Sequence, residues 1–409
     1  MLLNIHNIPY VGRHGKVEHR TEHQIARKIS EYLSDTEFFY VEFFTGPDIC
    51  KADITDICTP DILKQIRLGE IQIAFHNIHE GFHDISTGIV RFCKNNQIPT
   101  ENVIIITSNH GIMPWLNRTI ERQQVAKPRV VLCEVFEIQS TMILDIFKRD
   151  MSVKTTYAEA IDAWIDLTHN PDLITHRYLN LNRRQRSHRV MLVSALLARH
   201  SDAHGKISFA NSDFGEAERQ REIIENAPFY WVNHPEVREQ IENSLDDICG
   251  KIPMYLDTTE LVTNRAASEL TDSNLYNTTG ISIVSETTFF QTSCSLGTYS
   301  GEPGVFLSEK AWKPILHFHP WVMVSQPHTQ QALKNYGYQT FSEFWDESYD
   351  YETDDSQRMF MILRLIEKMS EWPDRKFKEI ISESKPICRH NIDLLHSKQH
   401  GKDFIRELT

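Results

Sequence analysis

Short apolar runs alternate with segments of helical periodicity along the first 170 residues. β-branched and aromatic residues dominate the runs, and the segments between them repeat apolar residues at helical spacing. Strands separated by helix-length connections favour a parallel sheet covered by helices. The predicted strands are residues 2–5, 38–44, 71–75, 103–107 and 130–135, and the predicted helices are residues 22–33, 85–95 and 115–124.

The same alternation resumes after His169-Asn-Pro-Asp172, where a helical stretch ends at Asn-Pro. The predicted strands there are residues 177–181, 207–209, 281–284 and 321–324, and the predicted helices are residues 186–199 and 356–372. Residues 211–275 are loop-rich and acidic and receive no assignment, whereas residues 374–408 have a helical pattern. The pattern as a whole predicts an α/β protein.

A chain of 409 residues is too long for one ordinary core, which favours two domains. We expect residues 1–170 to form an N-terminal Rossmann-like domain and residues 171–373 to form a second one. The remaining residues, 374–409, are expected to be helices that pack back on the first domain.

The composition is that of a globular protein, with 40% hydrophobic and 24% charged residues. Its seven cysteines are scattered and form no CxxC pair, which argues against disulfides or a structural metal and favours a reducing compartment. No apolar run approaches the roughly 20 residues of a membrane span. We therefore expect a cytoplasmic protein, in the host cell if it is viral, with no membrane partner.

The formal net charge is −13, and both halves of the chain are acidic. Residues 1–170 carry 17 Lys and Arg against 22 Asp and Glu, and the remainder carries 26 against 34. This balance argues against broad, salt-driven nucleic-acid binding. A local basic groove stays open as an alternative.

Four arginines and a histidine crowd the turn that follows the strand at residues 177–181. Arg183, Arg186 and Arg189 recur every three residues and therefore share one side of the predicted helix start. Their charges repel one another unless an anion lies among them, and a helix N-terminus adds unpaired N–H groups. The pattern favours a phosphate site. The alternative is that these arginines pair with acids elsewhere.

A second cluster of charges lies in residues 306–315, where Glu309 and Lys310 open a predicted helix and Lys313 follows one turn later. An acceptor and two cations on one turn suit a ligand that carries hydroxyls beside a diphosphate, which is the chemistry of a nucleotide-sugar. Upstream, Glu286 ends a predicted strand, where a carboxylate can accept hydrogen bonds from sugar hydroxyls. The alternative is a surface helix with solvated charges.

The order of these motifs resembles a group of glycosyltransferase-like proteins of large tailed phages and their marine relatives. The matching segments are Asn-Arg-x-x-Arg-x-His-Arg at 182–189, Ser-Glu-Thr at 285–287, Ser-Glu-Lys-x-Trp-Lys-Pro-Ile at 308–315, and residues 337–350. The Glu-Lys helix is also similar to the donor-binding motif of α-1,3-fucosyltransferases, which have the GT-B fold. The resemblance covers residues 177–350 and is thin over residues 1–170.

The resemblance implies a GT-B-like fold, in which two Rossmann-like domains with parallel sheets face an interdomain cleft. The second domain would hold a nucleoside-diphosphate-sugar, with Glu309 on donor hydroxyls, Lys310 on the diphosphate, and Arg183 or Arg186 on the leaving phosphate. No Asp-x-Asp motif ends a strand, so we expect no metal ion and no other cofactor. The predicted donor-binding residues are Asn182, Arg183, Arg186, Arg189, Glu286, Ser308, Glu309, Lys310 and Lys313.

The leading acceptor implied by the resemblance is a hydroxymethylated pyrimidine in phage DNA, and a glycan or a small-molecule hydroxyl is the alternative. Polar loops beyond the strands of the first domain supply the candidate base, because a carboxylate or imidazole there can take the acceptor proton. The candidates are Glu80, Asp84 and His110 for the base and Arg13, His14 and His79 for acceptor binding. Retaining transfer would need no such base.

Two readings without transfer stay open. One is a binding module of the same fold that holds a nucleotide or a carbohydrate without turnover, and the other is a different two-domain α/β enzyme, such as a sugar-nucleotide epimerase. Asp346-Glu-Ser-Tyr-Asp350 is expected to hold the donor helix in place by hydrogen bonds rather than to act in catalysis.

Overall fold

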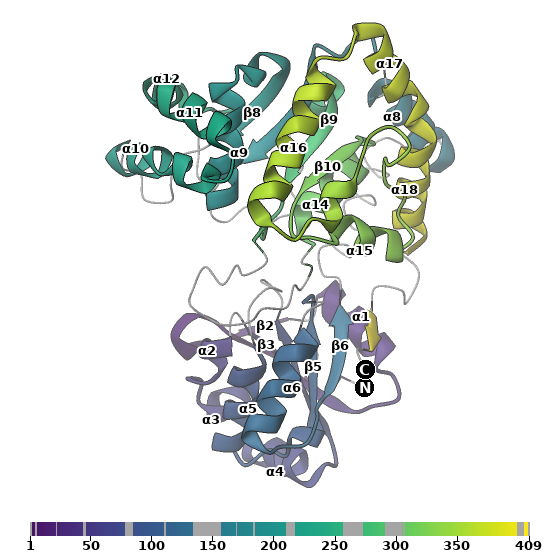
Figure 1. The fold of residues 1–409 in the computed structure, drawn as a ribbon. Coiled ribbons are helices and arrows are strands. Elements are labelled where there is room, and N and C mark those ends of the chain that lie inside the picture. The colour runs from purple at the N-terminus through teal and green to yellow at the C-terminus, as the bar shows by residue number, and fades with distance from the viewer. Residues whose placement is uncertain are drawn as a thin grey trace. The chain divides into compact units, whose positions relative to one another are not determined.

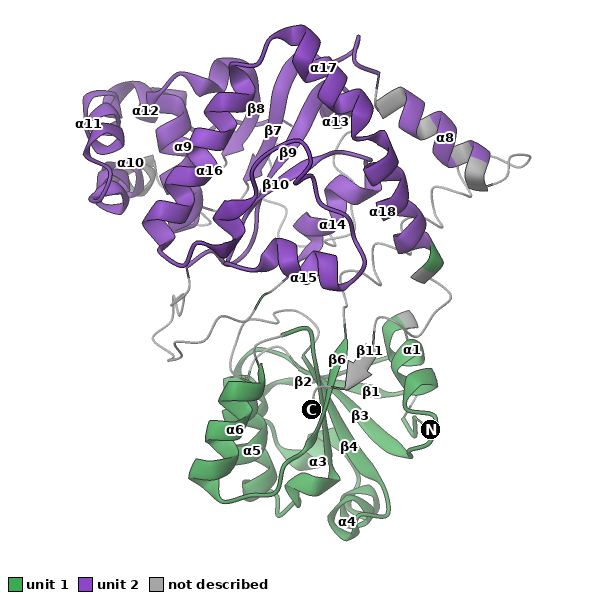
Figure 2. Cartoon of the chain, turned by 45° about the vertical axis from the view of Figure 1, so that its right-hand side comes forward, with its two compact units in different colours: residues 1–138, 294–306, 397–409 green, residues 139–293, 307–396 purple. Residues whose placement is uncertain are grey.

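The computed structural model divides into two compact units (Figure 2). Unit 1 comprises residues 1–138, 294–306 and 397–409, and unit 2 comprises residues 139–293 and 307–396. Both units are mixed α/β with mainly parallel strands, which is compatible with two Rossmann-like domains. The structure describes residues 2–4, 6–21, 23–43, 46–77, 85–109, 112–133, 157–168, 170–182, 185–209, 217–256, 273–290, 305, 307–398 and 405–407.

Unit 1 is built on a seven-stranded sheet in the order β11-β6-β5-β4-β3-β1-β2 (Figure 1). Strands β1, β3, β4, β5 and β6 are parallel, and the edge strands β2 and β11 are antiparallel to their neighbours. The strands are β1 (Ile8–Val11), β2 (Val17–Arg20), β3 (Phe38–Phe43), β4 (Gln72–Asn77), β5 (Val103–Thr107), β6 (Arg129–Cys133) and β11 (Ile405–Glu407). The α-helices are α1 (Gln24–Tyr32), α2 (Gly46–Ile49), α3 (Ile54–Ile57), α4 (Pro60–Leu68), α5 (Ser86–Asn95) and α6 (Ile112–Gln123).

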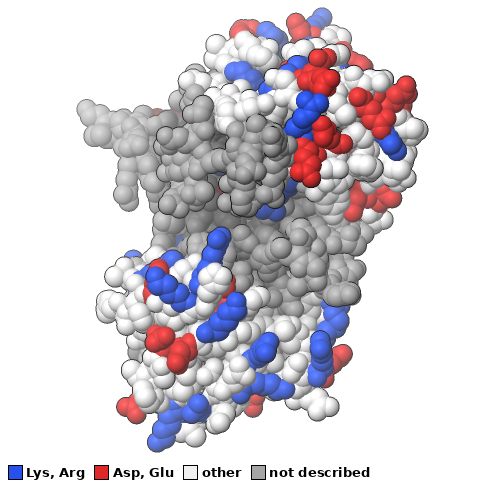
Figure 3. Space-filling model, turned by 90° about the vertical axis from the view of Figure 1, so that its left-hand side faces the viewer, with Lys and Arg blue, Asp and Glu red and all other residues white. Residues whose placement is uncertain are grey.

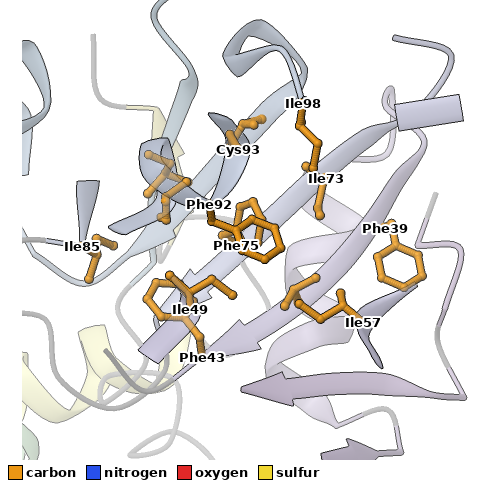
Figure 4. Packing of buried hydrophobic residues seen from close by; sticks show 14 of the residues in the cluster. Phe39, Phe43, Ile49, Ile57, Ile73, Phe75, Ile85, Phe92, Cys93 and Ile98 are labelled. Carbon is orange, nitrogen blue, oxygen red and sulfur yellow. The ribbon is translucent and has the colours of Figure 1, made fainter. Parts of the chain in front are cut away.

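The two faces of this sheet are covered unequally in the part of unit 1 that is described. Successive strand residues point to opposite faces. Phe39, Phe43 and Phe75 point to the face where α2 to α6 pack, and Phe75 meets Phe92 of α5 edge to face, with ring centroids 5.6 Å apart (Figure 4). The alternate residues form a separate cluster with α1. The second face is therefore covered mainly by one helix.

Unit 2 is built on a parallel four-stranded sheet in the order β10-β9-β7-β8. The chain builds β7 and β8 first and then adds β9 on the other side of β7, so the strand order reverses between β7 and β9. The strands are β7 (His176–Asn182), β8 (Gly205–Phe209), β9 (Thr279–Ser285) and β10 (Trp321–Val324). The α-helices are α8 (Tyr157–Thr168), α9 (Ser187–Ala198), α10 (Ala217–Glu225), α11 (Pro235–Asn243), α12 (Leu245–Lys251), α13 (Ser273–Asn277), α14 (Glu309–Leu316), α15 (Thr329–Asn335), α16 (Asp355–Ser370), α17 (Asp374–Glu383) and α18 (Lys385–Lys398).

Two predictions about the ends of the chain are wrong. The first strand is Ile8–Val11 rather than residues 2–5, where Leu2 makes only an isolated bridge to Phe38. The side chain of Asn4 explains this, because its amide exchanges hydrogen bonds of 2.8 and 3.0 Å with the backbone of Tyr40 in place of a strand partner. The C-terminal tail is not helical to residue 408, since β11 pairs with β6.

The units also divide the chain differently from the expected domains. Helix α8, which falls within residues 1–170, belongs to unit 2, and so do α17 and most of α18. Of the described residues after 396, β11 is the part that joins the sheet of unit 1. The chain thus returns to unit 1 through a strand rather than through helices.

Gly88 should be sensitive to any side chain, because a Cβ there would lie 2.2 Å from the backbone oxygen of Gly46. We expect Gly88→Ala to lower the free energy of unfolding by about 1–3 kcal/mol through overpacking. Thermal or urea unfolding measures this. Gly12→Ala is the matched control in unit 1, since its Cβ would make ordinary contacts of 3.5 and 3.6 Å and its φ is −80°. Equal stabilities of the two variants would contradict the close packing of α5 on α2.

Candidate functional site

The carboxyl edge of the unit 2 sheet brings together predicted donor residues from three separate segments. Asn182 ends β7, Glu286 follows β9, and Ser308 precedes α14. The strand order reverses between β7 and β9, which makes this edge the switch point of the sheet. In open parallel sheets, ligands bind at such a switch point.

The carboxylate of Glu286 is completely buried and fixes the start of α14. Its Oε1 accepts a hydrogen bond from the Ser308 backbone N–H at 3.0 Å, and its Oε2 accepts one from the Ser308 hydroxyl at 2.6 Å. The backbone N–H of Thr287 donates to Oε2 as well, at 2.8 Å. Both oxygens are therefore engaged inside the protein, and Glu286 ties the end of β9 to α14.

Lys310 extends from the first turn of α14 over the end of β9. Its Nζ lies 3.0 Å from the Ser308 hydroxyl, 3.3 Å from the Thr287 hydroxyl and 2.7 Å from Glu309 Oε1. The side chains of Lys310 and Glu309 are 25% and 27% exposed, so both reach the surface. An ammonium group and a carboxylate are thus held together at the surface of this edge.

Glu309 is ionised at any physiological pH. Burial alone would raise the pKa of its carboxyl, but the charge and hydrogen bond of Lys310 and the charge of Lys313 lower the pKa to about 2. Lys313 lies one turn after Lys310 and is half-buried. Glu309 is therefore a permanent hydrogen-bond acceptor beside two cations.

Three side chains at the N-terminus of α9 donate hydrogen bonds to the backbone at the end of β9 and directly after it. Arg186 Nη1 donates to the Thr287 carbonyl at 2.9 Å, His188 Nε2 donates to the Glu286 carbonyl at 2.9 Å, and Arg189 Nη2 donates to the Ser285 carbonyl at 3.1 Å. Arg186 is half-buried, whereas His188 and Arg189 are buried. Arg186 from α9 and Lys310 from α14 therefore meet at one residue, Thr287.

Burial and the nearby positive charges both lower the pKa of His188. Burial lowers the pKa of this imidazole, and the charges of Arg189, Arg186 and Lys310 lower it further, so that it lies well below the ordinary value despite the bond to the Glu286 carbonyl. His188 is therefore neutral. The imidazole acts as a donor to the backbone and adds no charge to the three cations around it.

Asn182 places an acceptor at the same edge. Its side-chain Nδ2 donates to Asn180 Oδ1 at 2.5 Å, and its backbone N–H donates to the Ser208 hydroxyl at 3.1 Å. Its buried Oδ1 makes no hydrogen bond with any residue that the structure describes. An amide oxygen in this state can accept a hydrogen bond from a ligand hydroxyl or amine.

A buried arginine holds the loops that follow β9 and β10. Arg358 of α16 is 1% exposed and donates to the carbonyls of Phe289, Ser325 and Glu352 at 2.6, 3.1 and 2.8 Å. Its guanidinium also lies over the Phe289 ring, 4.3 Å from the centroid, and pairs with Asp355. The carboxyl edge of the sheet is therefore fixed from the α16 side as well.

The acids of residues 346–350 have the expected structural role but hold a different helix. Asp350 accepts from the backbone N–H groups of Gln330 and Gln331 at 2.9 and 3.1 Å, and Glu347 accepts from Lys334 at 3.2 Å. These partners belong to α15, whereas the prediction placed them on the donor helix α14.

Several predicted residues are not part of this edge or lie outside the described residues. Arg13 and His14 are exposed in unit 1, in the turn between β1 and β2. The residues outside the described part are Arg183, His79, Glu80, Asp84 and His110.

Sequence reasoning missed a second polar cluster, in unit 1. Tyr40 and Glu42 of β3 and His76 of β4 are completely buried, the Tyr40 hydroxyl contacts both Glu42 and His76, and Glu42 also pairs with His23. Glu42 lies within the predicted strand at residues 38–44, and His76 directly follows the predicted strand at residues 71–75. A carboxylate and an imidazole at such positions are the signal that could have found this cluster.

Among the described residues, no group of three or more His, Cys, Asp or Glu is arranged to hold a metal ion. No helix formed by them has the length and apolar character to cross a membrane.

Replacing Glu286 by Gln should destabilise unit 2. The amide nitrogen cannot accept a hydrogen bond, so one of the N–H groups of Thr287 and Ser308 loses its partner while buried. We expect the free energy of unfolding to fall by about 1–3 kcal/mol. Urea unfolding measures the change, and Glu343→Gln at an exposed position is the control, expected within about 0.5 kcal/mol of the wild type. Two equally stable variants would show that Glu286 does not anchor α14.

Comparison with known proteins assigns no family to this chain. No known family model matches it, and no curated protein matches it.

Proposed function

We propose that this protein is a glycosyltransferase that takes its sugar from a nucleoside-diphosphate-sugar bound at the carboxyl edge of unit 2. One observation carries the proposal. Arg186 and Lys310, from two different helices, both contact Thr287 at the point where the strand order reverses, with ionised Glu309 beside them. Two cations and a carboxylate at a switch point fit a diphosphate joined to hydroxyl-bearing rings.

The charge that develops on the leaving nucleoside diphosphate supports the same assignment. When the bond from the sugar carbon to the β-phosphate oxygen breaks, negative charge develops on that oxygen. Lys310 and Arg186 are held in place by bonds to Thr287 and Ser308, so they require little reorganisation when the charge appears. Preorganised donors of this kind contribute about 3–4 kcal/mol of transition-state stabilisation each.

In this proposal Glu309 and Asn182, rather than Glu286, accept hydrogen bonds from the hydroxyls of the donor. Both oxygens of Glu286 are engaged with Ser308 and Thr287. Glu309 is about a quarter exposed and ionised, and Asn182 Oδ1 is an acceptor with no hydrogen bond among the described residues. In this proposal Glu286 positions Lys310 through Ser308, and the other two accept hydrogen bonds from the donor.

The acceptor belongs to unit 1 in the GT-B arrangement that we propose for the two units. The leading acceptor is a hydroxymethylated pyrimidine in phage DNA, with a glycan or a small-molecule hydroxyl as the alternative. Exposed Arg13, His14 and Lys16 lie in one turn, and Arg118 and Arg122 are exposed on α6. Lys and Arg side chains recur over the face of unit 1 seen in Figure 3, with acidic side chains among them.

Lys310→Met tests the donor site. The side chain keeps its length but loses its charge, so we expect at least tenfold weaker binding of the donor. A thermal-shift screen of UDP-, GDP- and ADP-sugars on the wild-type protein first identifies the donor, because a ligand held by the native state raises the melting temperature. Titration of both proteins with that donor then gives the two affinities.

Lys368→Met, at an exposed position of α16, is the matched control and should bind the donor as the wild type does. No shift with any nucleotide-sugar, or equal affinities of the Lys310 and Lys368 variants, would overturn the proposed function. A donor that binds but never releases its nucleoside diphosphate, with or without acceptor, would instead identify a binding module of the same fold.

A further inference from the structure

Two asparagines at the carboxyl end of β7 form a buried pair. Successive strand residues point to opposite faces, so Asn180 and Asn182 share one face of the sheet. Asn180 is 0% exposed and Asn182 is 1% exposed. Strand β7 pairs with β8 on one side and with β9 on the other, and Asn182 is its last residue. The pair therefore leads from the interior of unit 2 to the switch point of its sheet.

A backbone carbonyl determines the orientation of the inner amide. The carbonyl of Ile283 in β9 can only accept a hydrogen bond, and Asn180 Nδ2 donates to it at 2.7 Å. The same nitrogen lies 3.2 Å from the Ser285 hydroxyl. The amide of Asn180 thus presents its nitrogen to β9 and its oxygen, Oδ1, to Asn182.

The orientation of the outer amide follows from that of the inner one. Because Asn180 Oδ1 is an acceptor, Asn182 must present its own nitrogen to it, and the two atoms lie 2.5 Å apart. A flipped Asn182 would place two amide oxygens against each other. Asn182 Oδ1 therefore lies at the end of the amide away from Asn180, and it makes no hydrogen bond with a described residue. The surroundings of β7 thus fix an acceptor, not a donor, at this edge.

This acceptor can bind only certain parts of a nucleoside-diphosphate-sugar. The oxygens of an ionised diphosphate only accept hydrogen bonds, so they cannot pair with Asn182 Oδ1, whereas hydroxyl and amino groups of the rings can. The amide is also uncharged. Unlike a carboxylate, it therefore leaves the charges of Arg186 and Lys310 to the diphosphate.

The burial of Asn182 favours the nucleoside half of the donor over the transferred sugar. The sugar carbon must be open to an acceptor hydroxyl, which suits Glu309, whose side chain is 27% exposed, better than Asn182 at 1%. Within the nucleoside, the nucleobases differ in their donor groups, but every ribose has two hydroxyls. A buried acceptor without a donor is unfavourable, so a ribose hydroxyl that reaches it gains a hydrogen bond that nothing else at the site has to give up.

We propose that Asn182 Oδ1 accepts a hydrogen bond from a ribose hydroxyl of the donor and makes the site selective for ribonucleotides over their deoxy forms. This inference rests on the proposed function, because it assigns one group of the donor at the same site. Asn182 is the specificity-determining residue, and Asn180 is its positioning residue. Glu309 is left for the hydroxyls of the transferred sugar.

Deoxynucleotides test this hydrogen bond directly. UDP, GDP and ADP are titrated into the wild-type protein by calorimetry, and the tightest of them is compared with its 2′-deoxy and 3′-deoxy forms. A net hydrogen bond between neutral groups corresponds to about tenfold in affinity, so one of the deoxy forms should bind about tenfold more weakly than the parent nucleotide. Asn182→Leu has no acceptor. We expect it to bind the parent about tenfold more weakly than the wild type does, and to bind that deoxy form as well as the parent.

Asn277→Leu is the matched control. Asn277 is another buried asparagine of unit 2, and its Oδ1 also makes no hydrogen bond with a described residue. It ends α13 just before the amino end of β9, at the opposite end of that strand from Glu286. This variant should keep both the affinity of the wild type and its preference for ribose. Asn182→Ala repeats the comparison with a smaller side chain, and the melting temperature of each free variant shows whether it folds.

The outcomes separate this inference from the proposed function. Equal binding of the parent nucleotide and both deoxy forms by the wild type overturns the role of Asn182, even if neither variant folds. A folded Asn182 variant that keeps the wild-type preference overturns it as well. A variant that binds the nucleoside diphosphate normally but its sugar conjugate weakly would place Asn182 on the sugar and contradict the assignment to ribose. If the wild type binds neither a nucleoside diphosphate nor a nucleotide-sugar, the proposed function fails and this inference fails with it.

Discussion

The buried carboxylate of Glu286 determines where the cations of unit 2 lie. It accepts three hydrogen bonds, from Thr287 and from the backbone and hydroxyl of Ser308, and so joins the end of β9 to the start of α14. Lys310 can then reach Thr287 from α14, and Arg186 reaches the same residue from α9. Both cations are therefore held by hydrogen bonds to one residue at the carboxyl edge of the sheet.

The strand order of unit 1 explains why its polar cluster is reachable. The parallel strands β3, β4, β5 and β6 are added in one direction, and crossovers between parallel strands are right-handed. Helices α4, α5 and α6 therefore fall on one face, where the larger cluster of apolar residues lies. Helix α1 follows the antiparallel strand β2, so this rule does not place it there. It packs on the other face, beside which His23 and Arg20 stay half exposed.

Most strands and several long helices were predictable, because buried parallel strands are continuous apolar runs and amphipathic helices have a strong period. That Asn182, Glu286 and Lys310 lie at one edge of the sheet was predictable for a related reason, since the carboxyl ends of the parallel strands β7 and β9 share that edge. The two predictions that were wrong, for residues 2–5 and for the C-terminal tail, depended on partners far away in the sequence. Asn4 displaces a strand by bonding Tyr40, and β11 pairs across the chain with β6. The local pattern of apolar and polar residues gives no information about either pairing.

The two buried glutamates show what the sequence leaves undecided. Glu42 lies one residue before the end of the apolar strand β3, Glu286 lies directly after the apolar strand β9, and both are fully buried. Their partners differ. Glu286 accepts hydrogen bonds from backbone and hydroxyl groups. Glu42 instead contacts the imidazole of His23, whose side chain is 34% exposed. A similar sequence context therefore yields an anchor for α14 in unit 2 and a carboxylate joined to a surface imidazole in unit 1.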